Sequence, residues 1–118
     1  MNHMPDPSHL LIARVHGVAA RGADLTAAAA ELATAALAEP GCLEFDVLAA
    51  PGGGSELVLI STWRSEAAMR AHFTSAAYGS YVSAVTDLLT RPSDVTIHRV
   101  AGTVHPLADL SSEPQRAS

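Results

Sequence analysis

The stretch EPGCLEFDVL, residues 39–48, decides the fold. Pro40 cannot continue a helix, and it biases Glu39 away from helical backbone angles. Gly41 can take the positive-φ conformation that reverses the chain direction. The residues CLEFDVL then alternate between apolar and polar side chains, with an apolar face formed by Leu43, Phe45 and Val47. The stretch therefore predicts a helix end, a tight turn and a strand with one face in solvent or partly covered.

The segments before this turn predict a strand and an alanine-rich helix. HLLIARVHGV, residues 9–18, is expected to be the first strand, with Leu10 and Ile12 on the face opposite Leu11, Ala13 and Val15. Asp24 is the expected N-cap of LTAAAAELATAALAE, because its carboxylate can accept hydrogen bonds from exposed helix amides. The apolar residues of that helix recur at helical spacing, as Leu25, Ala29, Leu32 and Ala36.

The segment after EPGCLEFDVL predicts a hairpin and a strand that is covered on both sides. APGGGSE is typical of a hairpin loop. ELVLISTW, residues 56–63, is apolar on both faces, which indicates a strand with both faces covered. One layer of helices covers only one face of a sheet. The other cover is therefore expected to be another sheet, most simply that of a second copy of the chain.

The remaining segments predict two helices and a last strand. Ser65 is expected to cap the helix EAAMRAHF, and Thr74 or Ser75 to start a further helix. The spacing in that helix predicts a shared face of Tyr78, Val82, Val85 and Leu89. Arg91-Pro92 ends it, and DVTIHRV, residues 94–100, is the expected last strand.

The order βαββαβ predicts an α+β, ferredoxin-like domain with an antiparallel sheet that carries its helices on one face. We expect a polar lead-in over residues 1–8, the domain over 9–104 and a polar tail over 105–118.

Composition and charge exclude several classes of function. The 118 residues suffice for one domain, and the formal net charge of -5 with no basic run argues against nucleic-acid binding. No apolar run reaches the roughly 20 residues that span a bilayer, so no membrane association is expected. The N-terminus does not read as a secretory signal, and we expect a cytoplasmic protein. The single cysteine, Cys42, cannot form an internal disulfide and is expected to be a buried, unreactive thiol.

Three segments together resemble the antibiotic biosynthesis monooxygenase family: EPGCLEFDVL at 39–48, LVLISTW at 57–63 and RSEAAMRAHF at 64–73. The resemblance covers residues 9 to 100. It implies a ferredoxin-like fold that forms a homodimer through its sheets, as a dimeric α/β barrel. It also implies a small aromatic substrate that is oxidised with O2, without metal or flavin. Two features differ from relatives. Ser61 stands where many of them have glutamate. The aromatic oxygenases use an asparagine beside the tryptophan of their pocket, whereas the one asparagine of this chain, Asn2, lies in the lead-in.

Two residues are the catalytic candidates. Trp63, the one tryptophan, could form a flat wall for a planar ligand, or it could be a core residue at a strand end. His72 could act as a general base towards a phenolic proton, because histidine exchanges protons near neutral pH. Alternatively, His72 could cap the break between the two helical segments by bonding a free carbonyl.

Five residues are the candidates for substrate binding. Tyr78 and Tyr81 lie three positions apart on one helix and could hydrogen-bond a quinone-like oxygen, or line the core. Ser61 shares the strand face of Trp63 and could donate to a ligand, or make room for a helix. Leu59 and Phe73 would be apolar walls of the pocket.

No metal site and no cofactor are expected, because the six histidines are spread over separate elements without an HxH or HxxxH pattern. The leading hypothesis is a cofactor-independent monooxygenase acting on an aromatic polyketide, anthrone or quinol-like compound. Two alternatives remain open: a cyclase or isomerase on the same barrel, and a non-catalytic dimeric protein that binds a small ligand. Haem degradation is a weaker alternative, since relatives with that activity use an asparagine, which no expected strand supplies.

Overall fold

The computed structural model describes residues 7–51 and 55–106. Its strands and helices, in chain order, are β1 (Ser8–His16), α1 (Gly22–Leu37), β2 (Cys42–Ala49), β3 (Glu56–Trp63), α2 (Glu66–Phe73), α3 (Ala76–Val85) and β4 (Asp94–Val100). Two short 3-10 helices, η1 (Ala19–Arg21) and η2 (Thr86–Leu88), flank α1 and α3. Most of the expected lead-in and tail, and the GGG of the hairpin, lie outside the described residues.

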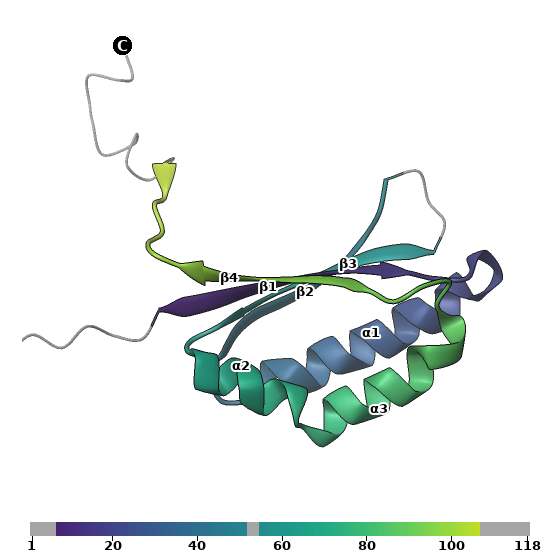
Figure 1. Ribbon diagram of the computed structural model, residues 1–118, viewed down its shortest axis with the longest axis horizontal. Helices are drawn as coiled ribbons and strands as arrows, with labels where there is room; N and C mark the ends of the chain where they lie inside the picture. The colour runs from purple at the N-terminus through teal and green to yellow at the C-terminus, as the bar shows by residue number, and fades with distance from the viewer. Residues whose placement is uncertain (1–6, 52–54, 107–118) are drawn as a thin grey trace, which may run out of the picture.

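The four strands form one antiparallel sheet in the order β2-β3-β1-β4. The three α-helices all lie against one face of this sheet, and no helix in the described part of the chain covers the other, open face (Figure 1). The predicted α+β ferredoxin-like fold is therefore confirmed. None of the helices in the described ranges is long and apolar enough to cross a membrane.

The core lies between the sheet and the helices. The predicted face of α1 is buried, since Leu25, Ala29 and Ala36 are fully covered and Leu32 is 3% exposed. On the sheet side, Leu11 and Val15 of β1 are buried against the helices. The strand β3 has the bounds that the sequence predicted, and its odd-numbered residues from Leu57 to Trp63 are buried in this core.

Two predicted caps are confirmed and one is wrong. The hydroxyl of Ser65 accepts a hydrogen bond from the Ala68 amide, and that of Ser75 accepts one from the Tyr78 amide, each at 3.1 Å. Asp24 does not cap α1, because the helix already begins at Gly22. Its carboxylate instead accepts a hydrogen bond from Nε of Arg21 at 2.7 Å.

Two predicted apolar faces need correction. Leu43 does not share the buried face of Phe45, because a β-bulge between Cys42 and Glu44 shifts the register of β2 and leaves Leu43 49% exposed. Val82 of α3 is 43% exposed. The other three predicted residues, Tyr78, Val85 and Leu89, do pack against the core, together with Tyr81 and Leu88.

The turn between α1 and β2 has the predicted geometry. Gly41 has a φ of 88°, a conformation that side chains disfavour. A Cβ at this position would lie 2.5 Å from Cβ of Ala68 in α2. The Gly41 carbonyl accepts a hydrogen bond of 2.7 Å from the amide of Arg64, at the end of β3. The turn is therefore fixed against the start of α2, and it sets the position of the preceding residue, Glu39.

Candidate functional site

A small cavity of about 60 Å³ lies between the sheet and the helices. Its walls are mostly apolar, and its polar lining comes from two serines, one histidine and two tyrosines. The lining residues are Leu11, Ala13, Val15, Leu32, Phe45, Leu59, Ser61, His72, Phe73, Tyr78, Tyr81, Ser93 and Val95. The lining is of the kind found at small-molecule sites, mostly apolar with a few convergent polar groups.

His72 is the most constrained polar side chain of this cavity. It lies near the end of α2 and is 2% exposed. Its Nδ1 lies 3.0 Å from Oε1 of Glu39, whose side chain is 20% exposed. Glu39 is the residue directly before the Pro40-Gly41 turn, so the helix stop that the sequence predicted also supplies the partner of this histidine. The side chain of His72 does not cap a backbone carbonyl, which was the alternative expectation.

The partner defines which nitrogen of His72 is free. An ionised Glu39 only accepts hydrogen bonds, so the proton of a neutral imidazole lies on Nδ1 and Nε2 carries the lone pair. No hydrogen bond joins Nε2 to any residue in the described ranges. His72 is one of the residues that line the cavity, so Nε2 is the nitrogen left for a ligand there. This arrangement suits a general base that is oriented by a carboxylate.

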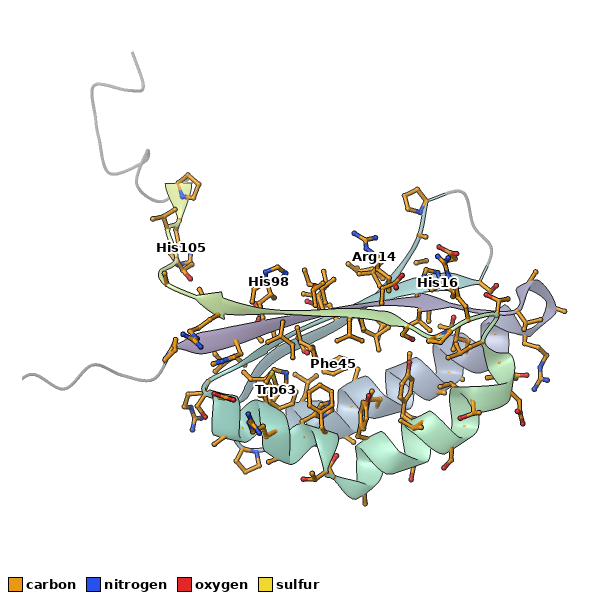
Figure 2. The ribbon with its side chains drawn as sticks, viewed as in Figure 1. Arg14, His16, Phe45, Trp63, His98 and His105 are labelled. Carbon is orange, nitrogen blue, oxygen red and sulfur yellow. The ribbon has the colours of Figure 1, made fainter. Side chains whose placement is uncertain are left out.

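Four aromatic rings surround the imidazole of His72. The ring centroid of Trp63 lies 4.6 Å away, that of Tyr78 5.3 Å, that of Phe73 5.6 Å and that of Phe45 6.0 Å. Figure 2 shows Phe45 and Trp63 directed from the sheet towards the helices. These rings hold the imidazole in one orientation and exclude water from most of its surface.

Trp63 and Ser61 are bound to each other. The indole Nε1 donates a hydrogen bond of 3.0 Å to Oγ of Ser61, and both residues are buried, at 0% and 2% exposure. Ser61 thus satisfies the one polar group of the tryptophan, and its hydroxyl proton is still available to a second acceptor. Trp63 is not among the residues that line the cavity; it lies behind His72.

The two tyrosines form a pair on α3, with ring centroids 6.2 Å apart. Burial raises the pKa of Tyr81 to about 12, and the neighbouring Tyr78 adds to the shift. Tyr81 therefore stays protonated at neutral pH and can donate its hydroxyl proton to an oxygen in the cavity.

Six of the seven predicted site residues line this cavity: Leu59, Ser61, His72, Phe73, Tyr78 and Tyr81. The seventh, Trp63, contacts His72. Sequence reasoning missed Glu39 and Phe45 as members of the site. Glu39 could have been predicted from the sequence, because it belongs to the EPGC motif and a buried histidine needs a hydrogen-bond partner.

Cys42 is only half-buried, which corrects the expectation of a buried thiol. Burial nevertheless raises the pKa of this thiol, and the charge of Glu39 adds to the increase. The reactive thiolate is therefore disfavoured, in line with the expected low reactivity. No group of three or more metal-binding side chains occurs among residues 7–51 and 55–106.

Sequence comparisons identify relatives of this chain. The family model described as antibiotic biosynthesis monooxygenase matches residues 8–84. The Mycobacterium tuberculosis protein named "Putative monooxygenase Rv0793" is 43% identical over 60 residues, which are 51% of this chain and 58% of that protein. The uncharacterised protein sll1783 of Synechocystis is 28% identical over 65 residues, 55% of this chain and 44% of that protein. The chain thus spans about half the length of these curated relatives.

Solved structures agree with this assignment. The structure of Rv0793 is 32% identical, with a TM-score of 0.77, and the match covers 83% of this chain and 99% of that one. PA3566 from Pseudomonas aeruginosa has the same TM-score at 19% identity, covering 85% of this chain and 100% of that one, and supports the fold alone. The family model and the likeness to Rv0793 together show that the chain belongs to the antibiotic biosynthesis monooxygenase family.

Proposed function

We propose that the protein is a monooxygenase that uses O2 to oxidise an aromatic polyketide, anthrone or quinol-like small molecule, without metal or flavin. The observation that carries the proposal is the Glu39–His72 pair beside the cavity. The pair supplies a base of fixed orientation within an aromatic, water-poor environment. Family membership makes O2 the oxidant to test first.

The proposed chemistry needs one proton transfer from the protein. Nε2 of His72 accepts the acidic proton of the substrate, and the resulting aromatic anion is electron-rich enough to reduce O2. For an anthrone, the methylene group becomes a carbonyl group; one oxygen atom enters the product and the other leaves as water. In this proposal the hydroxyl groups of Ser61 and Tyr81, two residues that line the cavity, donate hydrogen bonds to a substrate oxygen.

The same residues support a second function, a cyclase or isomerase that moves a proton and does not use O2. A histidine held by a carboxylate serves either reaction equally well. Product formation under strict anaerobiosis would assign the protein to this class. Oxygen uptake that requires His72 would assign it to the monooxygenases.

We further infer that the protein acts as a homodimer that pairs the open faces of two sheets. Leu10 and Ile12 of β1 and Val58 and Ile60 of β3 are half-buried on this face, and Leu48 of β2 is 48% exposed. A second sheet would cover these side chains. Sedimentation equilibrium is expected to give twice the chain mass, and Ile60→Asp is expected to give the mass of one chain. A single-chain mass for the unmodified protein would contradict the inference.

A further inference from the structure

A second hollow adjoins the cavity on the helical side of the sheet. This groove has a volume of about 400 Å³ and lies between α2 and the strands β1 and β4. It is lined by His9, Glu66, Met69, Arg70, Phe73, Ile97 and Arg99. Phe73 lines both hollows, so the groove and the cavity meet at this ring. Small-molecule sites usually measure roughly 300–1,000 Å³, so the inner cavity alone is too small for a fused aromatic ring system, whereas the groove is not.

The groove is positively charged in a chain whose formal net charge is -5. Arg70 is already paired, since its Nε and Nη2 donate to Oε2 of Glu66 at 2.8 and 2.6 Å. Arg99 forms no ion pair with any residue in the described parts of the chain. The charge of Arg99 is therefore available to a ligand.

The strand register places this charge next to the aromatic cluster. His9 of β1 lies opposite Arg99 of β4 on one side and opposite Trp63 of β3 on the other. The three residues thus form one row across the sheet, and His9 and Trp63 are both buried under the helices. Nδ1 of His9 lies 3.1 Å from the carbonyl oxygen of Pro7 and donates to it, so Nε2 is the nitrogen left for a ligand, and it donates only when the ring is protonated.

The carboxylate already present in the groove is stabilised there. The pKa of Glu66 is lowered mainly by its hydrogen bond to Arg70 and by the charge of Arg70, and His9 and Arg99 lower it further. His9 and Arg99 therefore lie close enough to Glu66 for their charges to favour its ionised form.

We propose that this groove binds a carboxylate group of the substrate, which makes the substrate an aromatic acid. Arg99 donates hydrogen bonds to the carboxylate, Nε2 of His9 donates a further one in the protonated form of its ring, and the aromatic rings extend past Phe73 towards His72. The proposal rests on the proposed function and narrows its substrate class.

The test is a binding measurement that needs no turnover. Anthraquinone-2-carboxylate and anthraquinone-2-carboxamide have the same ring system, differ in charge and are already oxidised. Quenching of the fluorescence of Trp63, the one tryptophan of the chain, reports binding of either compound. The same titration of free N-acetyltryptophanamide corrects for the light that the compounds absorb. The variant is Arg99→Gln. The matched control is Arg21→Gln, which removes the same charge from an exposed arginine in η1.

We expect the carboxylate to bind about tenfold more tightly than the carboxamide in the unmodified protein and in Arg21→Gln, because a charge-assisted hydrogen bond contributes that much. The preference should disappear in Arg99→Gln. Equal affinities in the unmodified protein, an unchanged preference in Arg99→Gln, or no binding of either compound would each overturn the proposal. Oxygen uptake with an uncharged anthrone that still requires His72 would show that only the carboxylate site had failed, and not the proposed function.

Discussion

Glu39 and His72 are separated by 33 positions in the chain, yet Oε1 of the glutamate lies 3.0 Å from Nδ1 of the histidine. The contact connects the turn that ends α1 with the last turn of α2. It makes the turn at Gly41 part of the candidate site, because any change there moves the carboxylate that orients the base.

The first prediction concerns this carboxylate. Glu39→Gln should lower the rate of substrate oxidation by about ten- to hundredfold, as is typical when a residue that orients a functional histidine is replaced. The amide is nearly the same size but accepts a weaker hydrogen bond, and it can also present its NH2 group to Nδ1. Rates measured over a range of pH give the readout, since a loss of orientation should change the pH profile as well as the maximum. Glu31→Gln, an exposed acid on α1, is the control, and equal rates in the two variants would count against a role for Glu39.

The second prediction concerns the bond between Trp63 and Ser61. Ser61→Ala should destabilise the fold by about 1–3 kcal/mol, because it leaves a fully buried indole N–H without an acceptor. In the double variant Ser61→Ala/Trp63→Phe, the loss of unfolding free energy should be smaller than the sum of the losses in the two single variants. The reason is that Trp63→Phe removes the indole N–H that Ser61→Ala leaves without an acceptor. Urea unfolding of the two single variants and the double variant measures this coupling. Additive losses would mean that the hydrogen bond does not contribute.

The third prediction concerns Gly41. Gly41→Ala should lower the free energy of unfolding by more than the roughly 1–2 kcal/mol that a side chain costs in the left-handed conformation. The loss is larger because the new Cβ also lies 2.5 Å from Cβ of Ala68. Gly79→Ala is the matched control: it lies within α3, and no atom of residues 7–51 and 55–106 lies inside 4 Å of the added Cβ, so it should stabilise by about 0.5–1 kcal/mol. Thermal unfolding compares the two. A Gly41→Ala variant as stable as Gly79→Ala would contradict the turn geometry.

The fourth prediction concerns how the stability of the fold depends on pH. It rests on a cluster on the open face of the sheet that consists of His16, Glu56, Asp94 and Arg91. Figure 2 shows that His16, like its neighbour Arg14 on β1, is directed away from the helices. The ring nitrogens of His16 lie 2.8 Å from Asp94 and 3.1 Å from Glu56, and Nη2 of Arg91 lies 3.3 Å from the nearer ring nitrogen. The hydrogen bond to Asp94 and then that to Glu56 raise the pKa of His16, while Arg91 opposes them. The bond to His16 lowers the pKa of Asp94.

The signs of these shifts define a pH window. A raised histidine pKa stabilises the fold below the ordinary value of 6.5, and this contribution is lost as pH rises through the folded-state value. The lowered pKa of Asp94 stabilises the fold above the ordinary value of 3.8, and that contribution is lost at lower pH. The cluster should therefore contribute most between about pH 4 and 6.5. Urea midpoints at pH 5, 6.5 and 8 should fall with pH in the unmodified protein, and the fall should be smaller in His16→Asn. The same fall in both proteins would show that the cluster is not its cause.

Much of the fold follows from local sequence. Strands β3 and β4 have the bounds that alternation and flanking turns predicted, and the Pro40-Gly41 turn has the geometry that its residues require. The errors arise where non-local packing overrides a local pattern. The bulge that exposes Leu43 depends on pairing with β3, and the early start of α1, which removes Asp24 from the cap, depends on the preceding 3-10 turn.

The site was predictable in its residue types and not in its contacts. His72 and the tyrosines stand out as titratable or aromatic residues beside a helix break, and the cavity brings them together. The pairing with Glu39, and the position of Trp63 behind His72, depend on how α2 packs against the turn and the sheet. No spacing within one segment of the sequence encodes that packing.

The most direct test of the central claim is oxygen uptake by the purified, metal-stripped protein with a panel of anthrones and hydroquinones, against boiled protein. We expect uptake above the rate of autoxidation that is lost in His72→Ala, reduced in Trp63→Phe and retained in His105→Ala, a change at an exposed histidine. Uptake that is the same in His72→Ala and Trp63→Phe as in the unmodified protein would contradict the assignment of the site. Uptake no faster than that of boiled protein across the panel would contradict the proposed reaction with these substrates and favour the isomerase.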